Sequence, residues 1–148
     1  MRRNISVSEL GDLLDLPLLA FLATYRRDGT VLQSPIWHEW HAGAFQFAVG
    51  TNDVKMQHMQ RDPRACLVVA ENAGAYRGIE VSGTPEMDSD PVRALDVFRR
   101  IAIRYLGPER GPKFAGDTGD GQTLVILRPG RLRTWDFVDD PILNVLSG

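Results

Sequence analysis

The amino-acid sequence predicts a mainly β fold, an antiparallel barrel with a few helices at its connections. About six short apolar segments have strand character, and most of them are joined by tight turns rich in Gly, Pro and Asp. No strand–helix–strand alternation and no G-x-G-x-x-G fingerprint appear, which disfavours a dinucleotide-binding α/β domain. Neighbouring strands should therefore pair antiparallel and close, wholly or partly, into a barrel.

The composition favours one globular domain over residues 1–148, a length sufficient for a core of its own. Apolar residues make up 43% and charged residues 24% of the chain, which is ordinary for a soluble protein. The net charge of −2 disfavours nucleic acid as a partner, and no apolar run is long enough for a membrane span. The N-terminus lacks the apolar core of a signal peptide, and Cys66 is the only cysteine. We therefore expect a cytoplasmic protein without an internal disulfide.

Each predicted strand is an apolar or alternating segment bounded by turn residues. Arg27-Asp28-Gly29 is typical of a hairpin turn between the first two strands. Pro35 lacks a backbone N–H, so the second strand should bulge there or lie at a sheet edge. The strands are expected over Leu18–Tyr25, Val31–Trp40, Phe45–Val49, Ala65–Glu71, Ile79–Met87, Thr123–Arg128 and Arg131–Val138.

Three helices are expected from their start and stop signals. The first follows the capping box of Ser6 and Glu9 and ends at Pro17. The second is capped by Thr51 or Asn52 and ends at Asp62, and the third runs from Asp90-Pro91 to Leu106-Gly107-Pro108. Two segments lack a clear period: Glu109–Gly121, which is predicted to be a surface loop, and the tail Asp139–Gly148.

The turn after the third strand has the features of a phosphate cradle. Gly50 allows a sharp exit from the strand, Thr51 offers a hydroxyl, and free N–H groups open the following helix. Lys55 lies in the first helical turn, where the helix macrodipole disfavours a cation unless an anion binds. The chain has two lysines and fifteen arginines, so a lysine here suggests a selected point charge. The alternative is a solvated surface lysine.

Four segments in succession resemble the pyridoxamine-5′-phosphate-oxidase-like split β-barrel family: LAFLATYRRDGTVLQSPIWHEW, FAVGTNDVKMQHMQRDPRACLVV, YRGIEVSGTPEM and RPGRLRTWDF. Within that family the chain is most similar to the flavin/deazaflavin oxidoreductase branch that uses coenzyme F420. The resemblance implies a six-stranded antiparallel split β-barrel, also called an FMN-binding split barrel, with flanking helices. It also implies a homodimer that binds its cofactor at the subunit interface.

The resemblance further implies which residues contact the cofactor. Thr51 and Lys55 would hold its phosphate, while His58 stands where the family often has Asn, which weakens its assignment. The tricyclic ring would be edged by Gln33, Ser34, Pro35, Ile36 and Trp37 and would lie above Ala48, Val49 and Gly50. Tyr76, Arg77 and Trp135 would close the pocket from the second subunit.

The expected activity is hydride transfer from reduced F420 to an unsaturated or conjugated small molecule. No catalytic side chain is expected, because the cofactor carries the reaction. A basic groove for its oligoglutamate tail would use Arg26, Arg27, Arg61 and Arg64. The alternatives are an FMN-dependent oxidase or reductase, and a non-catalytic binder of the cofactor or of a tetrapyrrole.

Other chemical signals are weaker. His38 and His41 have no third partner for a metal site, and the DTGDG segment at 117–121 lacks the full calcium-loop pattern. Cys66 lies in an apolar strand and is expected to be a small core residue. Trp37, Trp40 and Trp135 are equally compatible with ring stacking, core packing and interface burial.

Overall fold

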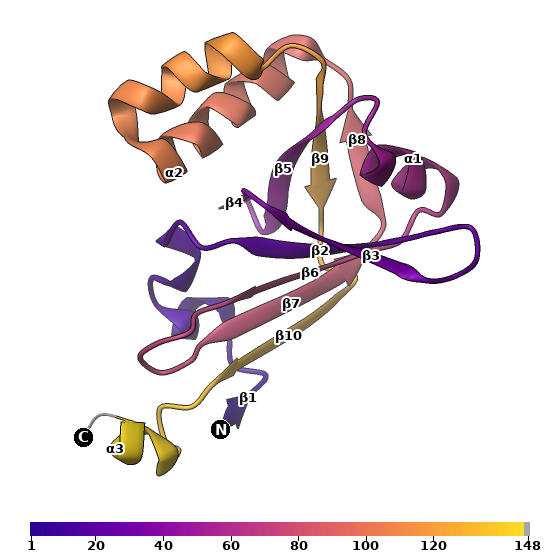
Figure 1. The fold of residues 1–148 in the computed structure, drawn as a ribbon. Helices are drawn as coiled ribbons and strands as arrows, with labels where there is room; N and C mark the ends of the chain where they lie inside the picture. Colours follow the sequence, from indigo (N-terminus) through magenta and orange to yellow (C-terminus); the bar gives the residue numbers. More distant parts are fainter. Residues whose placement is uncertain (147–148) are drawn as a thin grey trace.

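The computed structural model describes residues 1–146 and contains two antiparallel sheets whose strands cross at a large angle (Figure 1). The six-stranded sheet has the order β1 (Arg2–Arg3), β10 (Arg131–Asp136), β7 (Gly78–Gly83), β6 (Ala65–Ala70), β2 (Ala20–Tyr25) and β3 (Val31–Ile36). The four-stranded sheet has the order β4 (Glu39–His41), β5 (Ala44–Gly50), β9 (Gln122–Leu127) and β8 (Pro85–Asp88). The predicted mainly β, antiparallel architecture is confirmed.

Two predicted strands are each divided between the sheets. The predicted strand Val31–Trp40 forms β3 and β4, and Ile79–Met87 forms β7 and β8. The sequence pattern does not reveal where β3 ends and β4 begins, or where β7 ends and β8 begins, because apolar residues continue through both junctions. Pro35 lies on β3, the edge strand of its sheet, where a missing N–H costs no ladder bond on the open side.

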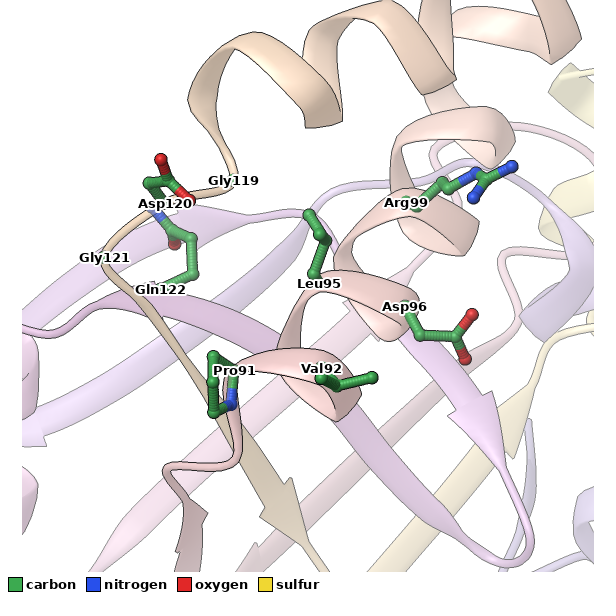
Figure 2. Close-up of a pocket in the computed structure, with 9 residues that line it drawn as sticks. All are labelled: Pro91, Val92, Leu95, Asp96, Arg99, Gly119, Asp120, Gly121 and Gln122. Carbon is green, nitrogen blue, oxygen red and sulfur yellow. The ribbon is translucent and has the colours of Figure 1, made fainter.

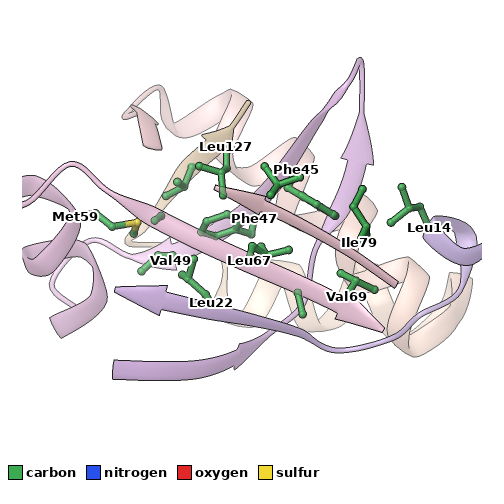
Figure 3. Close-up of a cluster of buried hydrophobic side chains, with 14 of the residues drawn as sticks. Leu14, Leu22, Phe45, Phe47, Val49, Met59, Leu67, Val69, Ile79 and Leu127 are labelled. Carbon is green, nitrogen blue, oxygen red and sulfur yellow. The ribbon is translucent and has the colours of Figure 1, made fainter. Parts of the chain in front are cut away.

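The main core fills the space between the two sheets (Figure 3). Along β5 the alternation sends Phe45, Phe47 and Val49 into this core, where they are buried against Leu22 and Leu67. Burial of each such side chain contributes roughly 1.5–3 kcal/mol. The opposite face of β5 is therefore free to carry other contacts.

Helix α2 (Pro91–Thr118) consists of two arms that lie side by side (Figure 1). The loop predicted at Glu109–Gly121 is therefore wrong over 109–118 and is confirmed only over 119–121. The first arm ends as predicted at Gly107, whose φ of 89° breaks the helix. Pro108 then starts the second arm, where a missing N–H is tolerated. Gly111 permits close contact of the arms, since a Cβ there would lie 2.6 Å from the Cα of Ile103. The glycines and prolines thus build a helical hairpin instead of a loop.

The other helices are short. The capping box is confirmed, with the Ser6 amide donating to the Glu9 carboxylate over 2.7 Å. The continuous helix expected after it is not formed, because Gly11, at a φ of 64°, separates two 3₁₀ turns, Val7–Leu10 and Leu13–Asp15. Helix α3 (Ile142–Leu146) lies in the tail, whose last residues, Ser147 and Gly148, are outside the described range.

Helix α1 (Val54–Arg61) is capped by Asp53, so the predicted caps Thr51 and Asn52 are wrong. The Asp53 carboxylate accepts the backbone N–H of Lys55 over 2.9 Å. A carboxylate is favoured at a helix N-terminus, and here it outcompetes the two neutral side chains. Lys55 keeps its predicted place in the first turn.

Candidate functional site

A pocket of about 480 Å³ lies where β3, β5, the start of α1 and both arms of α2 meet. Its volume is within the range of small-molecule and cofactor sites. Apolar and aromatic side chains supply most of the walls, with a few polar groups. It is lined by Leu19, Pro35, Ile36, Trp37, Ala48, Val49, Gly50, Asp53, Lys55, Phe98, Ile101, Phe114, Thr118 and Gln122.

Three separate segments predicted to contact a cofactor come together in this pocket. The residues concerned are Pro35, Ile36, Trp37, Ala48, Val49, Gly50 and Lys55. The alternation of β5 explains the convergence, because Ala48 and Gly50 face away from the main core and toward α2. Gly50 pairs in register with Gln122 of β9, which brings a further polar side chain to the same wall.

Sequence reasoning missed the walls supplied by α2. Phe98 and Ile101 come from its first arm, and Phe114 and Thr118 come from the second arm, which was predicted to be a loop. The helical spacing of Phe114 and Thr118 was a usable signal, since residues four apart share a helix face.

The cation of the pocket is already paired. The Lys55 ammonium lies 3.0 Å from the Asp53 carboxylate, and the lysine side chain is only 20% exposed. Burial alone would raise the pKa of Asp53, but the hydrogen bonds from the Lys55 amide and ammonium outweigh burial and lower it. An anion that binds Lys55 must therefore share or replace the Asp53 contact.

An aromatic cluster forms another part of the wall. Trp37 stacks on Tyr105 with ring centroids 4.9 Å apart, and Phe114 lies 5.5 Å from Trp37. The ring centroids of Phe98 and Phe114 are 5.9 Å apart. The Tyr105 hydroxyl donates to the Leu18 carbonyl over 2.6 Å, which fixes the ring behind Trp37. We call Trp37, Phe98 and Phe114 the aromatic wall.

His38 lies behind this wall and does not line the pocket. It is fully buried, and its Nδ1 lies 3.0 Å from the Tyr105 hydroxyl oxygen. Because that hydroxyl gives its proton to Leu18, Nδ1 must be the donor, which leaves Nε2 a buried acceptor without a partner. Burial, aided by the Arg104 guanidinium, lowers the pKa of His38 to about 4. The ring is therefore neutral and structural.

Three predicted cofactor residues lie near the pocket without lining it. The Thr51 hydroxyl is 2.8 Å from that of Thr123 and so is engaged within the fold. Ser34 is buried, and His58 is buried with Nδ1 3.0 Å from the Thr24 hydroxyl. Burial lowers the pKa of His58. These positions give His58 a packing role in the described chain.

Gln33 and Trp135 lie on the face of the six-stranded sheet that points away from the other sheet, here called the outer face. Register places side chains in cross-strand rows on this face. The Trp135 ring covers Gly78, where a Cβ would overlap it, and Arg133 lies above the same ring at 4.6 Å. One row contains Arg133, Glu80, Val68, Phe21 and Pro35, and the next contains Arg131, Ser82, Cys66, Ala23 and Gln33. Cys66 is thus half-buried and lies outside the core cluster, contrary to expectation.

Tyr76 and Arg77 lie in the turn between β6 and β7, outside the pocket. Arg77 forms a bidentate ion pair with Glu71 over 2.8 Å and also contacts Asp12 and the Leu10 carbonyl, each at 2.7 Å. The hydrogen bonds that the Arg77 guanidinium donates to the Glu71 carboxylate and, to a smaller extent, to that of Asp12 raise the pKa of Arg77. Whether these residues also reach a second subunit stays a prediction.

Replacing Arg77 with methionine should lower the free energy of unfolding by about 2–3 kcal/mol, because the largely buried Glu71 carboxylate loses its partner. Urea denaturation measures this. Arg99→Met, at an exposed site on α2, is the matched control and should change stability by less than about 0.5 kcal/mol. Unchanged stability in the Arg77 variant, together with lost cofactor binding, would instead place Arg77 in the pocket.

The arginines predicted for a basic groove lie around the β2–β3 hairpin and the end of α1. Arg26 donates to the Val31 carbonyl over 2.8 Å, and Arg61 donates to that of Tyr25. Arg64 pairs with Asp62 at 2.7 Å and lies over the Tyr25 ring. Arg27 is exposed. None of the four lines the pocket, so the groove stays a prediction.

A second hollow of about 410 Å³ lies beside the first arm of α2, between residues 91–99 and 119–122 (Figure 2). Leu95 points toward the Gly119–Gln122 segment across this hollow. None of the predicted cofactor residues lines it, which favours the first pocket as the candidate site.

Residues 1–146 contain no group of three or more His, Cys, Asp or Glu side chains arranged to hold a metal ion. No helix in that range has the length and apolarity needed to cross a membrane.

Comparisons with known proteins agree with the fold. The sequence model described as pyridoxamine 5′-phosphate oxidase matches residues 7–136. The conserved hypothetical protein Rv2991 from Mycobacterium tuberculosis is 22% identical, with a TM-score of 0.80 over 90% of this chain and 86% of its own. An F420 reductase is 27% identical, with a TM-score of 0.68 over 82% of this chain and 93% of its own. HutZ, a heme storage protein from Vibrio cholerae, is 13% identical, with a TM-score of 0.68 over 88% of this chain and 94% of its own. The search of curated proteins found no match.

Proposed function

The chain belongs to the pyridoxamine 5′-phosphate oxidase family, and on that premise we propose that it is an oxidoreductase that binds coenzyme F420. Its proposed reaction is hydride transfer from the reduced cofactor to an unsaturated or conjugated small molecule. The similarity to an F420 reductase at 27% identity supports F420 over FMN.

The observation that carries this proposal is the pocket in which Lys55 meets three of the five predicted ring-edging residues, Pro35, Ile36 and Trp37. The fit is chemical: Ala48, Gly50 and Trp37 offer a low-polarity wall for a ring, and Lys55 offers a cation for a phosphate. Bound there, the reduced cofactor would supply the hydride. The protein's own contribution is to orient the ring and to exclude water from its face.

The similarity to a heme storage protein makes a tetrapyrrole the second candidate ligand. A haem iron takes its axial ligands from His, Cys, Met or Tyr. The described residues that line the pocket include none of these four types. This composition supports the deazaflavin or flavin over the haem.

We further propose that a second copy of the chain covers the outer face and completes the pocket. Phe21 and Val31 on this face are 48% and 43% exposed, an unusual apolar surface for a strand pair. Pro35 belongs both to this face, opposite Phe21, and to the pocket wall. A dimer through the outer face would therefore place Trp135 and Gln33 of one subunit near the other subunit.

Phe21→Arg should convert the dimer to a monomer and weaken cofactor binding at least about tenfold, because a charge would be buried without a partner. Light scattering gives the mass, and titration gives the affinity. Val92→Arg, at a site on α2 that is 75% exposed, is the control and should keep both properties. A monomeric variant that binds cofactor normally would rule out a shared pocket.

The function itself is tested by titrating F420 and FMN separately into the cofactor-free protein. We expect saturable binding of F420 and weaker binding of FMN. Loss of the reduced-F420 signal on addition of an acceptor then separates an enzyme from a carrier. Binding of FMN but not F420 would assign the protein to the FMN-dependent alternative. If neither cofactor binds, the proposed function is wrong.

A further inference from the structure

The same pocket contains two aromatic side chains, Phe98 and Phe114, that are not among the predicted cofactor contacts, and the inference from them rests on the proposed function. The ring contacts place Trp37, Phe98 and Phe114 together, whereas the charged groups of the pocket, Asp53 and Lys55, pair with each other. The pocket thus combines one ion pair, whose charges offset each other, with a cluster of uncharged aromatic side chains.

Phe114 is the member of the aromatic wall that the fold needs least. It is 37% exposed and does not belong to the buried cluster under α2, which contains Ile101 and Leu124 with Trp37 packed against it. Its ring instead lies against Trp37 and Phe98 at the pocket surface. An aromatic side chain left at the surface of a pocket is available to stack on a ligand.

The second arm of α2 holds Phe114 at a fixed position. The arms touch at Gly111, one turn before Phe114, so closely that a Cβ at Gly111 would lie within 2.6 Å of the Ile103 backbone. On the other side, Trp37 is fixed by its stacking on Tyr105, with ring planes 6° apart. The aromatic wall is therefore preorganised.

The aromatic part of the wall carries no charge. The residues that accompany it are Leu19, Ile36 and Ile101, and the polar group supplied by the second arm of α2 is the Thr118 hydroxyl. A charged substrate would be desolvated there without a counter-charge, which is costly. A neutral planar molecule would lose little and would gain stacking on the rings.

We propose that Phe114 is a specificity-determining residue that selects neutral planar substrates over charged ones. It lies beside Trp37 in the aromatic wall, with the two ring centroids 5.5 Å apart. A substrate stacked on the exposed surface of this wall, here called the aromatic subsite, lies beside the segment predicted to edge the cofactor ring, which is the position that hydride transfer requires.

The test uses two naphthoquinones of the same ring size, menadione and 1,4-naphthoquinone-2-sulfonate, as acceptors for reduced F420. The reduced deazaflavin gives two electrons and one proton as hydride, water supplies the second proton, and the quinone becomes the hydroquinone. The wild-type protein should have a lower KM for menadione than for the sulfonate. Phe114→Ala should raise the KM for menadione about tenfold.

Phe114→Arg sharpens the test, because it places a cation on the same wall. It should raise kcat/KM for the sulfonate while lowering it for menadione. Val92→Ala, on an exposed part of α2 outside the pocket, is the control for the helix and should change neither constant. In all variants the dissociation constant of F420 should stay within about twofold of wild type.

The outcomes separate this inference from the proposed function. A Phe114→Ala variant with weakened F420 binding and an unchanged KM for menadione would overturn the subsite and assign Phe114 to the cofactor. If the protein binds no F420, isothermal titration with menadione alone tests the subsite. If menadione binds the wild-type protein and Phe114→Ala weakens that binding, the aromatic subsite is retained. If menadione binds both proteins equally, or binds neither, the subsite is rejected.

Discussion

Replacing Lys55 with alanine should weaken F420 binding by about ten- to a hundredfold, the largest effect on binding expected of any single substitution in the pocket. A charge-assisted hydrogen bond to a phosphate is worth roughly 1.5–3 kcal/mol, and alanine removes it completely. The substitution should leave the unfolding temperature unchanged, because Lys55 lies outside the buried core. Fluorescence titration measures the binding. The matched control is Lys113→Ala, the chain's other lysine, which is exposed and outside the pocket.

Asp53→Asn should have the opposite effect and tighten binding of the same cofactor. The Asp53 carboxylate forms an ion pair with the Lys55 ammonium, so an anionic ligand must compete with Asp53 for that cation. Asparagine retains the helix cap but removes the charge. If Lys55→Ala binds F420 as tightly as wild type, the phosphate cradle is wrong, and tightening by Asp53→Asn would then have no explanation.

Acidification from pH 6.5 to pH 4 should lower the free energy of unfolding by about 3 kcal/mol through His38 alone. Its pKa is about 4 in the folded protein, below the usual value of 6.5. Between these values the unfolded chain binds a proton that the folded chain does not, so stability is complete above pH 6.5 and declines as the pH falls. Urea denaturation across this range measures the slope.

The variant His38→Asn isolates the contribution of His38 to the pH dependence of stability. The asparagine amide still offers a donor to the Tyr105 hydroxyl, but it does not titrate. It should be less stable than wild type at pH 7 because of the smaller side chain, yet its stability should depend less on pH. A shallower dependence should remain, since burial also lowers the pKa of His58. An equal slope in wild type and variant would contradict a buried neutral His38. His41→Asn, at an exposed site, should keep the wild-type slope.

The sequence was sufficient for the parts of the fold that depend on local chemistry. The alternation of Phe45, Phe47 and Val49 predicted the strand, whereas the family resemblance pointed to Ala48 and Gly50 as the residues beneath a cofactor ring. Lys55 was identified from its place in a helical turn. Asp53 was missed because sequence alone does not decide which of three adjacent capping residues takes the position.

The parts that could not be predicted depend on contacts between distant segments. Residues 109–121 have the composition of a loop, and the helical state of 109–118 depends on the close contact of Gly111 with Ile103 across the two arms. The segment 31–40 is divided between two sheets because Pro35 pairs with Phe21 of one sheet and Trp40 pairs with Phe45 of the other. The strand pattern does not predict these pairings. The proposed contact of Trp135 with the cofactor rests on the proposed dimer, which the pattern of a single chain does not specify.

The hairpin of α2 makes the two halves of the pocket separable. The barrel contributes Ala48, Gly50 and Lys55, whereas one uninterrupted stretch after Gly107 contributes Phe114 and Thr118. Because that stretch enters at one residue and leaves near Gly119, it can be exchanged as a cassette without altering any barrel strand. If the proposed hydride transfer holds, diversification of this cassette alone, by natural drift or in a library, would give access to new acceptors while the barrel and its cofactor contacts stay unchanged.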